Sequence, residues 1–325
     1  MTQETSKGPN LAMDSVRVTE AVALAASRLM GSGDEQAADK AAVDSMHAAL
    51  KHLGIDGTIH KGEGAEGEAD KLFNGEKVGN GAGPEVDVAV MPLEGPTIVA
   101  KGEPNGLSVV ALAEGGDFLN VPDLYMDKIA VGGGLPGNIV DLDADPADNL
   151  KELAKAKGAG VNDLVVCILD RPRHGELIGK VRETGARIML IPDGDVSGVI
   201  ATMWLQSGID IYMGIGGAPQ GVLSAAALAC VGGQMQARLV IRNDGDRTLA
   251  SDCGITDTAR KYTAADMATG DITFAATGVT TGPMLSGVRY ARGIAVTHSL
   301  ALRSKTGTLR YIEAHHDFAH PGNIK

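Results

Sequence analysis

The chain has 325 residues, which is long enough for two domains or for one large α/β domain. Its 29 Lys and Arg stand against 41 Asp and Glu, and the formal net charge of −12 argues against a nucleic-acid backbone as the main partner. No apolar run approaches the roughly 20 residues of a membrane-spanning helix, and segment 1–10 lacks the apolar centre of a signal peptide, so we expect a cytoplasmic protein.

The first part of the chain predicts helices and strands without regular alternation. Apolar residues at helical spacing predict helices over 16–30 and 37–53, each followed by a glycine. Short apolar runs predict strands over 57–60 and 86–90, and the second of these leads into the turn "MPLEG". This pattern is typical of an α+β arrangement, so we predict one domain over 1–145.

The pattern then changes to three consecutive strand–turn–helix units. The strands read "DLVVCILD", "RIMLIPDG" and "IDIYMGIGG", and the helices read "HGELIGKVRETG", "DVSGVIATMWLQSG" and "APQGVLSAAALACVGG". Such units are typical of a parallel sheet with crossover helices, so the fold class is α/β, with a second domain over 146–325. We expect the polar tail after Ile312 to fray.

Polar residues follow two of these strands, at the edge where a parallel sheet binds its ligands. Arg171, Arg173 and His174 follow the first strand, and Asp193 and Asp195 follow the second. Arginines beside carboxylates suit a phosphate ester. The alternatives are a salt-bridged surface pair for the arginines and capping of the next helix for the aspartates, since Asp is a favoured N-cap residue.

Three acidic stretches of the first domain could hold a divalent cation, because Mg²⁺ takes oxygen ligands. They are "GSGDEQAAD", which contains Asp39, "GEGAEGEAD", which contains Glu63, and the "MPLEG" turn, which contains Glu94. For the glycine-rich loop, the alternative is a solvated surface turn.

Short blocks between residues 14 and 317 carry a more specific signal. In chain order they are "VRVTEA", "AADKAAVDSM", "IDGTI", "KGEGAEGEA", "NGEKVGNG", "VDVAVMPLEG", "YMDKIAVG", "ILDRPRH", "IPDGDV", "GIGGAPQG" and "FAATGVTTG". Their content and order resemble those of class II (bacterial-type) fructose-1,6-bisphosphatases, over nearly the whole chain.

The resemblance implies a layered sugar-phosphatase fold of the lithium-sensitive phosphatase type, with Mg²⁺ or Mn²⁺ as cofactor. It implies hydrolysis of fructose 1,6-bisphosphate to fructose 6-phosphate and phosphate by a homo-oligomer, either a dimer or a tetramer. The family's metal-binding and catalytic positions correspond to Asp39, Glu63 and Glu94. Its positions for the sugar and the remaining phosphate correspond to Tyr125, Arg171, Arg173, Asp193, Asp195, Gly216 and Gly217.

Several residues depart from the family's pattern, and all of them lie in its catalytic half. Met91 replaces the Asp of the metal-binding turn, Pro96 replaces a Thr, Gly67 replaces a metal-binding Asp and Gln220 replaces a Glu. A thioether cannot take the place of a carboxylate toward Mg²⁺, and proline offers neither a hydroxyl nor an amide donor. In addition, Glu35 stands where the family has a Lys.

Two functions therefore remain open. The first is a weakly active fructose-1,6-bisphosphatase, in which Glu66, Glu68 or Asp70 takes the place of the missing metal ligand; a hydrolase of altered specificity is a variant of this reading. The second is a catalytically impaired protein that binds a sugar phosphate or a protein partner for regulation. The sequence alone does not choose between them.

Overall fold

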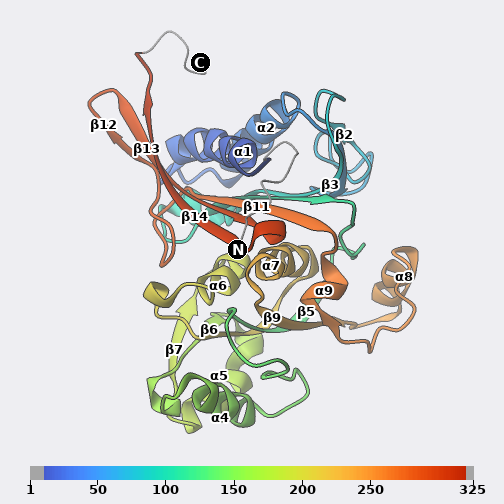
Figure 1. Ribbon diagram of the computed structural model, residues 1–325, viewed down its shortest axis with the longest axis vertical. Helices are drawn as coiled ribbons and strands as arrows, with labels where there is room; N and C mark the ends of the chain where they lie inside the picture. Colours follow the sequence, from blue (N-terminus) through green and yellow to red (C-terminus); the bar gives the residue numbers. More distant parts are fainter. Residues whose placement is uncertain (1–10, 320–325) are drawn as a thin grey trace, which may run out of the picture.

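The structure is a computed structural model that describes residues 11–319. The N-terminal segment 1–10, which was examined for a signal peptide, lies outside this range. Within 11–319, no helix is long and apolar enough to cross a membrane. The described chain forms two β-sheets with helices packed against them, a mixed α/β architecture (Figure 1).

The first sheet has eight strands, in the order β12-β13-β11-β4-β3-β1-β2, with β14 also paired to β13. Only the β1–β3 pairing is parallel. The strands are β1 (Asp56–Lys61), β2 (Lys77–Val78), β3 (Glu85–Glu94), β4 (Leu107–Glu114), β11 (Asp271–Gly278), β12 (Arg289–Ala291), β13 (Ile294–Arg303) and β14 (Thr308–Asp317).

The second sheet has six strands, in the order β10-β9-β5-β8-β6-β7. The three strands that the sequence predicted to be parallel, β6, β7 and β8, are parallel, whereas β5, β9 and β10 join them in antiparallel pairings. The strands are β5 (Tyr125–Val131), β6 (Val165–Leu169), β7 (Arg187–Ile191), β8 (Ile211–Gly217), β9 (Gln234–Val240) and β10 (Tyr262–Thr263).

Helices and sheets alternate in layers (Figure 1). Helices α1 (Leu11–Ala26) and α2 (Glu35–Leu50) cover the outer face of the first sheet, and α4 (Pro146–Lys157) and α5 (Gly175–Glu183) cover the outer face of the second. Between the sheets lie α6 (Asp195–Ala201), α7 (Ala218–Val231) and α9 (Ala264–Met267). The remaining helices are α3 (Pro96–Lys101) and α8 (Asp244–Asp252), with short 3₁₀ turns at Ser27–Leu29, Val161–Asp163, Pro172–His174, Leu205–Ser207 and Ser304–Thr306.

Helix α7 is buried along nearly all of its length because it packs against strands of both sheets. Its sequence is apolar all round, as a helix enclosed by two sheets requires. The sheets themselves interleave along the chain, since β5 belongs to the second and β11 to β14 belong to the first. The two sheets therefore do not correspond to residues 1–145 and 146–325, and the division of the chain into these two domains stays a prediction.

Two local expectations were wrong. The tail after Ile312 does not fray at once, because β14 continues to Asp317, which lies opposite Ile294 in the ladder with β13. The long edge of β13 supplies backbone partners, and an edge strand tolerates the exposed polar side chains of this segment. The helix predicted from Asp195 is also short: α6 ends at Ala201, and a 3₁₀ turn follows at Leu205–Ser207.

Candidate functional site

The turn after β3 keeps a tight shape in spite of its unusual sequence. Gly95 has a φ of +83°, a left-handed conformation that favours glycine, and a Cβ here would lie 2.8 Å from the Ile98 side chain. Pro96 occupies the first position of α3, where a missing N–H is tolerated and the fixed φ of proline suits a helix. Proline at 96 thus suits the turn, but it lacks the hydroxyl and the backbone N–H of the threonine that the resemblance implies at this position.

Glu94 points away from the first acidic stretch and toward α6. It is only 4% exposed, and its two carboxylate oxygens accept hydrogen bonds from the backbone N–H groups of Val196 at 2.8 Å and Ser197 at 3.0 Å. These donors belong to the first turn of α6, so Glu94 caps this helix from a distant strand. Burial and the neighbouring charge of Asp195 raise the pKa of Glu94 to about 8, while the two N–H donors oppose that shift.

Asp195 forms a buried ion pair with Lys128 of β5. The Lys128 ammonium also donates to the carbonyl of Gly217 at 2.8 Å. A Cβ at Gly216 would lie 2.0 Å from an Asp195 oxygen, so glycine at this position makes room for the pair. The alternative reading of the two aspartates as helix caps is wrong for Asp195: the N-cap position of α6 belongs to Gly194, and Asp195 is turned to Lys128.

Asp193, by contrast, lies at the open side of the site. Its side chain is 42% exposed, with a carboxylate oxygen 3.9 Å from the Arg171 guanidinium. The same oxygen accepts the N–H of Gly194 at 3.0 Å. Asp193 is therefore partly accessible at this side of the site, and its contact with a ligand stays a prediction.

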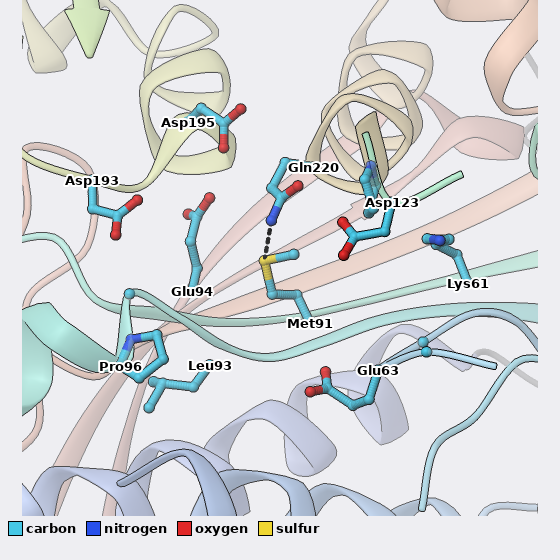
Figure 2. Close-up of a pocket in the computed structure, with 14 residues that line it drawn as sticks. Lys61, Glu63, Met91, Leu93, Glu94, Pro96, Asp123, Asp193, Asp195 and Gln220 are labelled. Carbon is cyan, nitrogen blue, oxygen red and sulfur yellow. Dashed lines mark hydrogen bonds between the residues drawn. The ribbon is translucent and has the colours of Figure 1, made fainter. Parts of the chain in front are cut away.

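Met91 and Gln220 contact each other where the family resemblance expects two carboxylates. The Gln220 amide nitrogen lies 3.9 Å from the Met91 sulfur and donates to it (Figure 2). A Cβ at Gly217 would lie 1.8 Å from the Gln220 amide oxygen, so a larger residue here would require the end of the Gln220 side chain to move. The space beside Gly216 and Gly217 is thus occupied by the side chains of Asp195 and Gln220.

These residues line a pocket of about 300 Å³, which we name the carboxylate pocket (Figure 2). It is lined by Lys61, Gly62, Glu63, Gly64, Met91, Leu93, Glu94, Gly95, Pro96, Asp123, Asp193, Asp195, Pro219 and Gln220. Among these described residues, Lys61 carries the only positive charge. Burial lowers the pKa of Lys61, and the nearby Asp123 carboxylate opposes the shift.

The other acidic residues of the first half are divided between this pocket and the surface. Glu63 lines the pocket although the residue as a whole is exposed, and desolvation of its carboxyl together with the negative charge of Asp39 raises its pKa to about 7. Asp39, on α2, also has a raised pKa because it is partly desolvated, but it does not line the pocket. Glu66, Glu68 and Asp70 are exposed, and none of these three described residues lines the pocket.

Glu35, another departure from the family's pattern, also has a defined neighbour. Its carboxylate accepts a hydrogen bond from the Thr97 hydroxyl at 2.9 Å, immediately beside Pro96. The hydroxyl nearest to the turn is therefore engaged with Glu35 and directed to α2.

The arrangement fits a divalent cation poorly. Within residues 11–319, no group of three or more His, Cys, Asp or Glu side chains is placed to hold a metal ion. Glu94 is satisfied by α6, Met91 and Gln220 are neutral, and Lys61 brings a positive charge into the same pocket. Ligation of a metal ion by Asp39, Glu63 and Glu94 therefore stays a prediction.

A second, more basic pocket of about 420 Å³ adjoins the first, and we name it the arginine pocket. At its wall the Arg173 guanidinium lies 4.9 Å from the centre of the Tyr125 ring, and the Arg242 guanidinium lies 5.6 Å from it. Arg173 donates to the carbonyl of Ile215 at 2.8 and 3.2 Å, which fixes its position. Arg171 lines the same pocket, so three guanidinium groups surround one polar cavity, a composition that suits a phosphate group.

His174 supports this pocket from behind and does not face a ligand. It is 2% exposed; Nδ1 lies 2.7 Å from the Leu169 carbonyl, and Nε2 accepts the N–H of Ile215 at 2.8 Å. These partners require a neutral ring with the proton on Nδ1. Burial, together with the nearby Arg173 charge, lowers the pKa of His174.

The two pockets share four lining residues, namely Asp123, Asp193, Asp195 and Gln220. Sequence reasoning had missed four residues of this site: Lys61, Asp123, Lys128 and Arg242. Arg242 follows β9 at the same edge of the sheet as the predicted residues, so the strand-end argument could have found it. Lys61 and Lys128 lie in the blocks "KGEGAEGEA" and "YMDKIAVG", but nothing in these blocks singles out the lysine as a site residue.

The fold and these adjoining pockets define an α/β protein in which a pocket lined by three arginines adjoins a pocket whose charged groups, apart from Lys61, are carboxylates. A family model described as "Bacterial fructose-1,6-bisphosphatase, glpX-encoded" matches residues 9–316. The chain belongs to this class II fructose-1,6-bisphosphatase family, whose members use divalent metal ions.

Relatives of this family include "Fructose-1,6-bisphosphatase 1 class 2" of Escherichia coli strain K12 and "Fructose-1,6-bisphosphatase class 2" of Shigella flexneri. Each is 43% identical to this chain over 320 residues, which cover 94% of this chain and 95% of the relative. The protein of Escherichia coli O6:H1 shows the same identity and coverage.

Proposed function

We propose that this protein binds fructose 1,6-bisphosphate across the two pockets and hydrolyses it much more slowly than a family member with a complete set of carboxylates. The observation that carries the proposal is the continuity of the arginine pocket with the carboxylate pocket. One phosphate would bind Arg171, Arg173 and Arg242, the sugar would contact Tyr125 and Asp193, and the second phosphate would reach the carboxylate pocket.

The slow turnover follows from the acidic side of the site. Met91 and Pro96 provide no ligand or hydroxyl, and Glu94 is bound to α6. Loss of a residue that only hydrogen-bonds to a metal ligand commonly lowers metal affinity or activity 10–100-fold. We retain Asp39, Glu63 and Glu94 as the proposed ligands of Mg²⁺ or Mn²⁺, and we propose that they bind it weakly.

The resemblance supports two further proposals. One is that the layers of helix and sheet follow the lithium-sensitive phosphatase fold. The other is that the protein forms a homo-oligomer, a dimer or a tetramer. A structural comparison would test the first proposal, and sedimentation analysis would test the second.

The function is tested by measuring binding and hydrolysis separately. Isothermal titration with fructose 6-phosphate and with fructose 1,6-bisphosphate, both in EDTA, should show binding of each ligand. Phosphate release with Mg²⁺ or Mn²⁺ should be slow, and it should rise in a Met91→Asp, Pro96→Thr, Gln220→Glu triple variant. Gly67 is left unchanged in this variant, because its φ of +89° would strain a side chain.

Each arm of the experiment can overturn its part of the proposal. If neither sugar phosphate binds, the binding function is wrong. If the parent chain releases phosphate as fast as the triple variant, the reduced turnover is wrong. If the parent binds both ligands and releases no phosphate, the protein is a sugar-phosphate-binding protein without turnover, the alternative that the neutral Met91–Gln220 pair favours.

A further inference from the structure

A buried lysine in the carboxylate pocket has no counterpart among the expected site residues. Lys61 is the last residue of β1, is 4% exposed, and lines the pocket with Glu63, Glu94 and Asp123 (Figure 2). Its ammonium donates to the backbone carbonyl of Val121 at 3.1 Å. Within the described chain this is its one hydrogen-bond acceptor, so two of its three N–H donors are available to a ligand.

Carboxylates that line the pocket offset part of the cost of burying the Lys61 charge. A buried ammonium is unfavourable unless negative charges compensate it. Asp123 exerts such an effect on Lys61, and the other charged groups that line the pocket are carboxylates. A divalent cation placed among the same carboxylates would be repelled by the ammonium, because the repulsion of like charges is strong in a partly buried cavity.

We propose that the Lys61 ammonium is the resident cation of the carboxylate pocket, where it disfavours a divalent ion and binds the phosphate at this end of the ligand. Lysine is a common phosphate-binding residue and acts as a point charge. The part that concerns the ligand rests on the proposed function, since the phosphate in question is the one opposite the arginine pocket. The part that concerns the divalent ion stands on the pocket alone.

The first test is the affinity for Mn²⁺ alone, measured by titration calorimetry and by the electron paramagnetic resonance signal of free Mn²⁺. The Lys61→Met and Lys61→Gln variants should bind Mn²⁺ at least about tenfold more tightly than the parent chain, because a charge of the same sign has been removed. Gln retains a donor for the Val121 carbonyl, so it covers the case in which Met impairs folding. Unchanged or weaker Mn²⁺ affinity in a folded variant would overturn this part.

The second test compares two ligands in EDTA. Lys61→Gln should weaken the binding of fructose 1,6-bisphosphate by about tenfold and leave the binding of fructose 6-phosphate unchanged. The reason is that only the bisphosphate places a phosphate beside Lys61. Lys61→Arg, which keeps the charge, should restore part of the affinity. The control is Lys151→Met, at an exposed position of α4 on the far side of the second sheet.

The outcomes distinguish the inference from the function on which it partly rests. If neither ligand binds the parent chain, the proposed function fails, and the Mn²⁺ titration still decides the role of Lys61. If both ligands bind and Lys61→Gln weakens neither, or weakens both equally, the assignment of Lys61 to the second phosphate is wrong.

Discussion

The amide of Gln220 donates to the thioether sulfur of Met91 across 3.9 Å. The two residues come from α7 and β3, yet they meet at the centre of the carboxylate pocket (Figure 2). Two carboxylates at these positions would repel each other and would require a cation between them. The neutral pair removes both charges and, with them, this requirement for a cation.

The first prediction restores these two charges. The Met91→Asp, Gln220→Glu double variant should bind Mn²⁺ about 10–100-fold more tightly than the parent chain, with smaller gains in each single variant. In EDTA it should unfold at a lower temperature, because the carboxylates then face each other without a cation. Calorimetry and thermal unfolding with and without Mn²⁺ measure both effects, and Met91→Leu is the matched control. A double variant that gains no Mn²⁺ affinity would contradict this account.

The second prediction concerns the arginine pocket. Arg173→Gln and Arg242→Gln should each lower the affinity for fructose 6-phosphate by about tenfold or more, because a hydrogen bond to a charged group contributes about 1.5–3 kcal/mol. Tyr125→Phe should change affinity little, since the ring that both guanidinium groups contact is kept. Titration calorimetry provides the measurement, and Arg182→Gln, at an exposed position of α5, is the control. Equal affinities in all four variants would exclude a phosphate from this pocket.

The third prediction concerns the buried Lys128–Asp195 pair. Lys128→Met leaves the Asp195 carboxylate buried without its partner and should lower the free energy of unfolding by about 3–5 kcal/mol. The double variant Lys128→Met, Asp195→Leu should recover part of this loss, because both buried charges are then gone. Urea denaturation of the parent chain, Lys128→Met, Asp195→Leu and the double variant forms a double-mutant cycle. A loss below about 1 kcal/mol in Lys128→Met would show that water reaches the pair.

The fourth prediction is a pH dependence from His174. Its pKa is lowered in the folded chain, so between the ordinary value of 6.5 and the lower folded value the unfolded chain binds a proton that the folded chain does not. The contribution of neutral His174 to the free energy of unfolding is therefore fully present above about pH 6.5, and it is lost as the pH falls through the folded pKa. His174→Gln can keep both hydrogen bonds without titrating, and it should flatten this part of the profile. An unaltered profile of unfolding free energy against pH would refute the role of His174.

Protonation of His174 should also affect binding. The ring accepts the N–H of Ile215, and the carbonyl of the same residue anchors Arg173. Loss of the ring acceptor therefore disturbs the support of the arginine pocket. When the pH falls to the lowered pKa of folded His174, fructose 6-phosphate should bind more weakly to the parent chain than to His174→Gln, after correction for titration of the phosphate itself.

The sequence predicted the parts of the site that depend on local order along the chain. Arg171, Arg173 and Asp193 were found because the carboxyl ends of parallel strands meet at one edge of a sheet. The parallel strands β6, β7 and β8 were found because their strand–helix alternation is local. The blocks shared with the family then named the reaction class, which periodicity alone could not do.

The partners that decide each role lie too far away in the chain to be predicted. The N–H groups that hold Glu94 come 102 and 103 positions later, and Asp195 lies 67 positions after Lys128. Both arrangements exist only when α6 packs between the two sheets (Figure 1). The sequence could therefore place Glu94 in the turn, but it could not show which way the carboxylate points.

The hydrogen bonds of Glu94 change what its presence in a sequence means. Glu94 is the last residue of a strand of the first sheet, and it accepts hydrogen bonds from a helix that packs on β6 and β8 of the second. It therefore connects the two sheets. This structural role of Glu94 does not depend on whether the neighbouring pocket still catalyses a reaction. A count of surviving acidic residues would score Glu94 as evidence of an active enzyme, whereas its place in this chain would be the same in a protein that had stopped turning over its ligand.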